Sequence, residues 1–223
     1  MAQSLVPDGL RFATFSETVT LICRKLSMTY KQRLVFVLAC LLTWSSGVYA
    51  APVEISGVRV EDPITLHGSK LLLNGAGVRY KAVFKVYVAA MYVGIKASTP
   101  EEVYAAPGPK RLSITLLRDI DSSEIGKTFA KAIEGPSLKG EMARFIPNLI
   151  EMEQNFAAHE KLLAGENFTI DWVPGTGTVL TLKGKPRGEP FKEIELFNTL
   201  IGIWLGPFAA DWKLRDALLG KTF

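Results

Sequence analysis

Residues 78–94, VRYKAVFKVYVAAMYVG, constrain the fold more than any other part of the chain. The segment is rich in valine, tyrosine and phenylalanine, and its residues alternate between two faces with a period of two, which predicts one long β-strand. The face that contains Arg79 is charged at its start and apolar later, so we expect the strand to enter the core partway along its length. Just upstream, Gly75, Ala76 and Gly77 interrupt an apolar run and predict a backbone turn.

The same patterns predict the remaining elements, and their order indicates the fold class. Strands are expected at residues 53–60, 69–73 and 110–118, with a strand pair around a Pro-Gly turn at 167–185. Helices are expected at residues 119–135, 144–165, 193–206 and 211–220, the last between Asp211 as N-cap and Gly220 as C-cap. The basic segment at 183–192 is interpreted as a solvated loop. Because no strand–helix–strand alternation occurs, we predict an α+β fold in which helices cover one face of a large antiparallel sheet.

The N-terminal segment differs in character from the rest of the chain. Lys31 and Arg33 precede an apolar run at residues 34–44 that is too short to cross a bilayer as a stable helix. Small residues follow, up to Ala50, in the pattern typical of a cleavage site. We therefore expect a secretory signal peptide at residues 28–50, cut after Ala50, and an uncleaved membrane anchor is the alternative.

This interpretation sets the expected domain organisation and location. Residues 1–27 would be an over-extended N-terminus, and residues 51–223 would form one periplasmic or secreted domain without a stable membrane span. Both cysteines, Cys23 and Cys40, would be removed with the leader. The mature chain would then have no disulfide and no thiolate metal ligand.

Charge and motifs exclude several classes of function. Residues 1–50 hold five of the 26 basic residues and two of the 22 acidic ones, so the remaining chain is close to neutral and has no basic stripe for nucleic acid. The two histidines, His67 and His159, are far apart and lack metal-ligand spacing. The glycine motifs match neither a dinucleotide fingerprint nor a P-loop, and there is no serine-hydrolase elbow. We expect no metal and no cofactor.

Arg79 and Tyr87 are the residues best suited to hold a ligand. In one continuous strand they would face the same side but lie about 26 Å apart, too far to share one small ligand unless a bend or bulge intervenes. A guanidinium pairs well with an anionic oxygen, and a tyrosine hydroxyl can supply another donor. An arginine in this role is expected to lack a full protein partner. The alternative is an arginine at a strand mouth that pairs with a surface acid.

Two stretches of the chain, LLLNGAGVRYKAVFKVYVAAMYVG and IGIWLGPFAADWKLRDALLG, resemble the bacterial secreted branch of the chalcone-isomerase-like family. The resemblance covers about residues 52–223 and implies an open-faced β-sandwich with a ligand cleft between sheet and helices. Arg79 matches the arginine that contacts the ligand in this family. Tyr87 matches a tyrosine that assists it in the fatty-acid-binding members, where the enzymes carry threonine.

The resemblance also bears on catalysis. The family's enzymes cyclise chalcones with a tyrosine and an asparagine on a helix whose counterpart here, SSEIGKTFAKAI, has neither. Thr199 matches the hydroxyl residue of a later helix. The resemblance thus implies a non-catalytic binder of a small hydrophobic or aromatic anion, such as a fatty acid, and we expect the protein to be a monomer. The alternatives are an isomerase (intramolecular lyase) acting on a chalcone-like enone, and a structural or chaperone-like protein.

Overall fold

A computed structural model describes residues 53–121, 124, 144–157, 161–209 and 211–221. The chain divides into two compact units, Met1–Tyr49 and Ala50–Phe223, and every described residue belongs to the second. The signal peptide expected at residues 28–50 and its cleavage site therefore lie outside the described residues. The same is true of His159 and of most of the helix expected at 119–135.

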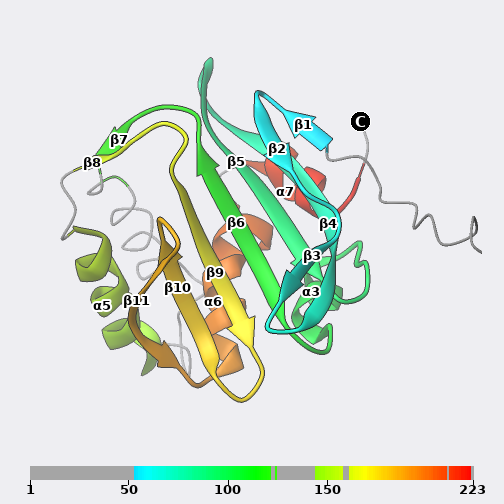
Figure 1. Ribbon diagram of the computed structural model, residues 1–223, viewed down its shortest axis with the longest axis vertical. Helices are drawn as coiled ribbons and strands as arrows, with labels where there is room; N and C mark the ends of the chain where they lie inside the picture. The colour runs from blue at the N-terminus through cyan, green and yellow to red at the C-terminus, as the bar shows by residue number, and fades with distance from the viewer. Residues whose placement is uncertain (1–52, 122–123, 125–143, 158–160, 210, 222–223) are drawn as a thin grey trace, which may run out of the picture. The chain divides into compact units, whose positions relative to one another are not determined.

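Among the described residues, a seven-stranded sheet in which every pairing is antiparallel forms the centre of this unit (Figure 1). Its strands in spatial order are β11 (Lys185–Phe191), β10 (Gly177–Leu182), β9 (Asn167–Val173), β6 (Lys110–Leu116), β5 (Phe84–Val93), β4 (Ser69–Lys81) and β3 (Ile64–Leu66). Two short ribbons pair β1 (Val53–Ile55) with β2 (Val58–Val60), and β7 (Ile120–Asp121) with β8 (Lys161–Leu162).

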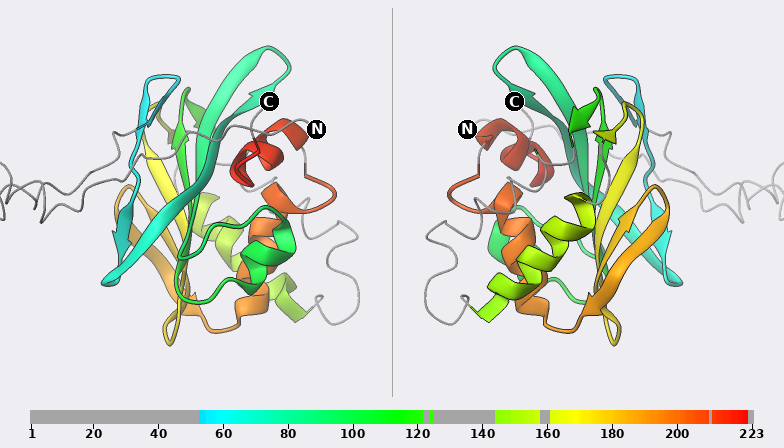
Figure 2. Two further views of the ribbon diagram at one scale, coloured as in Figure 1. Left: turned by 90° about the vertical axis from the view of Figure 1, so that its right-hand side faces the viewer. Right: turned by 90° about the vertical axis from the view of Figure 1, so that its left-hand side faces the viewer.

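The helices lie on one side of the curled sheet in both views of Figure 2. They are α3 (Pro100–Ala105), α5 (Ile146–Ala157), α6 (Ile194–Leu205) and α7 (Trp212–Leu218). The predicted α+β class, with helices covering one face of a large antiparallel sheet, is confirmed. No helix in the described part of the chain is both long and apolar enough to cross a bilayer.

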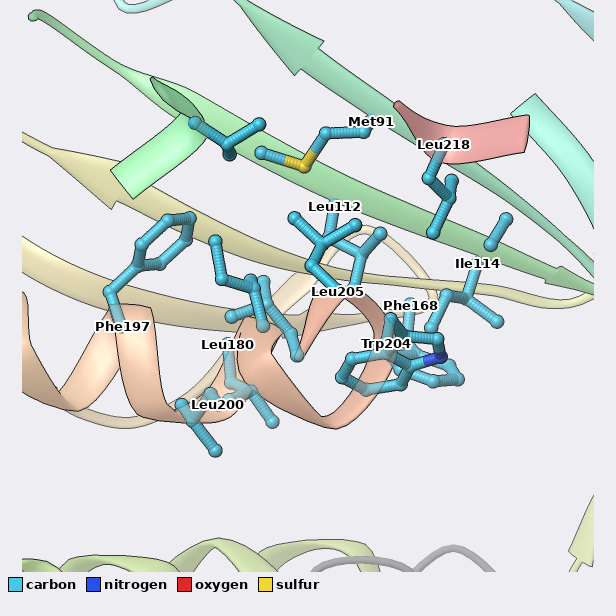
Figure 3. Close-up of a cluster of buried hydrophobic side chains, with 14 of the residues drawn as sticks. Met91, Leu112, Ile114, Phe168, Leu180, Phe197, Leu200, Trp204, Leu205 and Leu218 are labelled. Atoms are coloured by element: carbon cyan, nitrogen blue, oxygen red, sulfur yellow. The ribbon is translucent and has the colours of Figure 1, made fainter. Parts of the chain in front are cut away.

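The main core lies between the sheet and α6. Every second residue of β6 is buried, because a strand presents alternate side chains to the helices. α6 is apolar on nearly all sides, as predicted for a buried helix, and it meets the sheet as shown in Figure 3. The side chains that it buries are Leu196, Phe197, Leu200, Ile201, Trp204 and Leu205.

The opposite face of the sheet is covered only in part. Over β4 and β5 it forms a second apolar cluster with β1, β2 and β3. Further along, over β6 and β9, this face is polar: Arg111 donates two hydrogen bonds to Asp171, at 2.7 and 2.6 Å, and Asn167 donates one to Ser113 at 2.9 Å. The sheet is therefore open-faced on the side away from the helices.

Residues 78–94 do not form one strand, which corrects the sequence prediction. They form a hairpin in which β4 and β5 pair across a two-residue turn at Ala82 and Val83. The pairing runs through Tyr80 opposite Lys85 and then Arg79 opposite Tyr87, so Val86 is an extra residue, a β-bulge on β5. The expected bend between Arg79 and Tyr87 is thus present as a turn and a bulge.

The turn predicted at Gly75, Ala76 and Gly77 is also wrong, because all three lie inside β4. A bulge at Asn74 sets the phase of the strand so that the two glycines face α7. A Cβ on Gly75 would lie 2.0 Å from the carbonyl oxygen of Ala217. The glycines are needed for the close approach of a helix to the strand rather than for a turn.

Other elements differ from the prediction for local reasons. The segment interpreted as a solvated loop contains β11, an edge strand that accepts Pro186 and Pro190 because one side of an edge strand needs no partner. The helix expected at 144–165 is shorter, since α5 is followed by β8. The strand expected at 53–60 is the β1–β2 hairpin, and α3 was not predicted although Thr99 and Pro100 are typical of a helix start.

Lys110 is an unexpected charge in the main core. Its side chain is fully buried, its Nζ donates to the carbonyl oxygen of Tyr104 at 2.9 Å, and it lies 5.9 Å from the centroid of the Phe197 ring. No carboxylate of a described residue forms an ion pair with it. Burial lowers the pKa of Lys110 to about 8.

This burial predicts a pH-dependent cost in stability. The pKa of Lys110 is lower in the folded chain than in the unfolded chain, where a lysine titrates near 10.4. The unfolding free energy contributed by this group should therefore be lowest below pH 8 and rise between about pH 8 and 10.4. Lys110→Met should stabilise the protein at pH 7 and flatten this rise, measured by urea unfolding at several pH values. The exposed control, Lys96→Met, should change the unfolding free energy by less than about 0.5 kcal/mol, and an equal effect of both variants would contradict the prediction.

Candidate functional site

The hairpin brings Arg79 and Tyr87 together. They are direct cross-strand partners on β4 and β5, so their Cα atoms are about 5 Å apart rather than about 26 Å. Tyr87 packs against the main core, and Arg79 follows Gly75 and Gly77 on the face of β4 that meets α7. Both side chains therefore face the helix layer of the sandwich.

Arg79 has a protein partner, contrary to the expectation for an anion anchor. Its Nη1 donates to Oδ2 of Asp211 at 3.1 Å and to the carbonyl oxygen of Tyr80 at 2.6 Å. The side chains of Arg79 and Asp211 are 23% and 13% exposed, so this ion pair is partly shielded from water. Because both hydrogen bonds use Nη1, Asp211 does not engage the remaining N–H groups of the guanidinium.

Asp211 links this strand to the start of α7. Its Oδ1 accepts hydrogen bonds from the backbone N–H groups of Lys213 and Leu214, both at 3.1 Å, which confirms the predicted N-cap. Its Oδ2 accepts from the N–H of Tyr80 at 3.2 Å as well as from Arg79. Burial raises the pKa of Asp211, but these hydrogen bonds together outweigh burial and hold the pKa below its usual value. The carboxylate is thus ionised at neutral pH.

Tyr87 is held by a side chain of α6. Its hydroxyl oxygen accepts a hydrogen bond of 2.8 Å from Nε1 of Trp204, near the end of α6. Burial raises the pKa of Tyr87, while the bond from Trp204 and the nearby charge of Arg79 only partly offset this effect. The phenol is therefore neutral at physiological pH, and its own O–H remains a donor.

Thr199, the third residue predicted to bind ligand, does not share this position. It lies on α6 five residues before Trp204, so the two side chains leave the helix about 140° apart. Its hydroxyl donates to the carbonyl oxygen of Glu195 at 2.8 Å. The ligand-binding roles of Thr199, Arg79 and Tyr87 stay predictions.

Other features of the described residues do not add to this pair. A surface depression of about 280 Å³ lies at the C-terminal end of α7, away from Asp211, and is lined by Asn74, Lys96, Ala97, Ser98, Glu102, Leu219 and Gly220. The Asn74 side chain there bonds to the backbone of Ala97 and Leu218, so it joins segments of the fold. His67 is a turn residue, as predicted. The described part of the chain holds no cluster of three residues suited to a metal ion.

Sequence reasoning missed two residues of the site. Asp211 was predicted as a helix cap but not as the partner of Arg79, and no role was predicted for Trp204. These contacts join residues 132 and 117 positions apart in the chain. No local pattern signals such a contact, because strand and helix periodicities describe only neighbouring residues.

The fold and the Arg79–Tyr87 pair define an α+β protein with an open-faced, curled antiparallel sheet and a polar pair at the edge of its main core. The family model described as chalcone isomerase-like matches residues 52–220, so the chain belongs to the chalcone isomerase-like family. A similar solved structure is the crystal structure of a fatty-acid binding protein of Arabidopsis thaliana, with a TM-score of 0.58 and 14% sequence identity. The match covers 75% of this chain and 95% of the plant protein. No curated protein matches the sequence significantly.

Proposed function

We propose that this protein is a non-catalytic binder of a small hydrophobic or aromatic anion, such as a fatty acid, and that Arg79 and Tyr87 hold the anionic group. The observation that carries the proposal is the position of these two side chains. They are cross-strand partners whose side chains lie between the sheet and the helices. Each side chain also has N–H or O–H groups that its bonds to Asp211 and Trp204 do not use.

The chemistry of the pair suits a carboxylate. A carboxylate accepts several hydrogen bonds, and its charge is best matched by a guanidinium, which donates from a planar fork. The neutral Tyr87 hydroxyl adds a donor without adding a repelling charge. An apolar tail would find hydrophobic surface next to Tyr87, which packs against the main core.

Family membership and the shared fold of the Arabidopsis fatty-acid binding protein support this proposal. We further propose that the mature chain is a periplasmic or secreted monomer produced by cleavage after Ala50, as in the secreted bacterial branch of the family. The mass of the chain recovered from the producing cells tests the cleavage. A mass that still includes residues 28–50 would contradict it.

Native mass spectrometry of the purified protein tests the binding function. We expect a co-purified acyl ligand, its loss after delipidation, and its replacement when medium-chain fatty acids are added back. If nothing co-purifies and no medium-chain fatty acid binds to the delipidated protein, the proposal fails. Because the readout is the bound mass, the result does not depend on any assumed reaction.

A further inference from the structure

The tip of the β4–β5 hairpin carries an exposed apolar surface. Val83 and Phe84 at the turn are 83% and 61% exposed. Phe84 pairs with Lys81, so it lies on the face of the hairpin that also carries Arg79 and meets α7. Trp212, at the start of α7, is exposed too. We call these three residues, Val83, Phe84 and Trp212, the hairpin-tip surface. The N–H of Tyr80 donates to Asp211, the neighbour of Trp212, so the hairpin and the start of α7 lie side by side.

Positive charges surround this surface. Lys81 precedes the turn, the Arg118 guanidinium lies 5.8 Å from the centroid of the Phe84 ring, and the Lys213 ammonium lies 5.6 Å from that of Trp212. Lys81 is paired with Glu124, whereas no described carboxylate forms an ion pair with Arg118 or Lys213. Asp211 accepts from Arg79 and three backbone N–H groups, and Glu124 lies 3.6 Å from Lys81. The hairpin-tip surface is therefore apolar and aromatic within a basic rim.

This combination matches the surface of an anionic bilayer. Tryptophan favours the membrane–water interface because its ring is apolar and its N–H group is polar. Each lysine or arginine close to an anionic bilayer adds attraction that depends on ionic strength. A second copy of the chain is a poorer partner, because a symmetric contact through the same surface would bring the basic rims together.

We propose that the hairpin-tip surface docks reversibly on bilayers that contain anionic lipids, with Val83 and Phe84 inserted at the interface. The hairpin projects beyond its neighbouring strands, which leaves its tip free to touch a flat surface (Figure 2). Arg79 and Tyr87 lie on the same two strands. Docking would bring the anion site to a bilayer that supplies or accepts an acyl ligand. This role of docking rests on the proposed function.

Vesicle co-sedimentation tests the docking with the purified domain of residues 51–223. The protein should bind phosphatidylglycerol-containing vesicles at least tenfold more tightly than pure phosphatidylcholine vesicles, and raising the salt concentration from 0.05 to 0.5 M should weaken binding. Val83→Ser combined with Phe84→Ser should weaken binding at least tenfold, because two buried apolar side chains are lost. The control, Ile95→Ser, changes an exposed apolar residue outside the surface and should bind like the wild type.

The outcomes separate docking from the proposed function. The double variant should keep the wild-type affinity for a fatty acid in solution, since neither changed residue belongs to the anion site. Equal vesicle binding by the double variant and the wild type would overturn the docking proposal. So would a wild-type dimer, measured by light scattering, that becomes monomeric in the double variant without any vesicle binding. If the wild-type protein binds no fatty acid in solution, that result would instead count against the proposed function.

Discussion

Replacing Arg79 by alanine should weaken the binding of a medium-chain fatty acid about 10- to 150-fold, because a hydrogen bond to a charged group contributes about 1.5–3 kcal/mol and each 1.4 kcal/mol is tenfold. Arg79→Lys should recover only part of this loss, because an ammonium lacks the planar fork of a guanidinium. Titration calorimetry on delipidated protein measures both variants. Arg59 on β2, whose side chain is 71% exposed and pairs with the nearby Glu61, provides the control. Arg59→Ala should leave the affinity unchanged.

Arg79→Ala should also lower the stability of the protein, whereas removing an arginine without a protein partner would not. Removing Arg79 takes one hydrogen bond from Asp211, the N-cap of α7, and should cost about 1 kcal/mol and a fall in Tm of about 2–4 °C. The changes in affinity and in Tm together distinguish an anion-binding role of Arg79 from a purely structural one. A lower Tm with unchanged affinity would mean that Arg79 only anchors α7, and the anion-site proposal would fail.

Gly75→Ala should be among the most destabilising single changes in this domain. The new Cβ would meet three backbone atoms at the end of α7, the Ala217 oxygen at 2.0 Å, the Gly220 nitrogen at 2.8 Å and the Leu218 carbonyl carbon at 2.9 Å. Backbone atoms do not rotate away as side chains do, so the helix must shift. We expect a loss of about 3 kcal/mol, and a fall in Tm of about 6–12 °C.

Two other glycines provide a graded control series. A Cβ on Gly77 would meet the Cβ of Ala217 at 2.8 Å and a methyl carbon of Leu214 at 3.2 Å, so Gly77→Ala should destabilise less than Gly75→Ala. On Gly94 the nearest atom would be 3.7 Å away, an ordinary contact, and Gly94→Ala should change Tm little. Calorimetry of the three variants measures the order. A Tm of Gly75→Ala equal to that of Gly94→Ala would refute the close approach of α7 to β4.

Much of the fold could be predicted from local patterns. The alternation along β6, the apolar character of α6, the Pro-Gly turn between β9 and β10, and the Asp211 cap each depend on neighbouring residues, and each is present in the structure. Family membership was also recognisable from the sequence. The candidate pair, Arg79 and Tyr87, was found in the same way, although the reason for their proximity was not.

The β4–β5 hairpin shows why a clear pattern gave a wrong element. A two-residue turn pairs Lys81 with Phe84 and so shifts the alternation by one residue, and the bulge at Val86 shifts it back. The two shifts cancel between Arg79 and Tyr87, so these residues face the same side as they would in one continuous strand. The sequence pattern therefore resembles that of a single strand. Only the pairing of the strands reveals the hairpin, and with it the short distance between the two side chains.

The sequence by itself determined the α+β class, the buried helix α6, the alternation along β6 and the Asp211 cap, because periodicity and capping are local properties of the chain. The tertiary structure alone decided the partners: Asp211 for Arg79, Trp204 for Tyr87 and α7 for Gly75. Each of these contacts joins residues more than 100 positions apart, and packing in three dimensions selects them by shape and by the need of buried polar groups for hydrogen bonds.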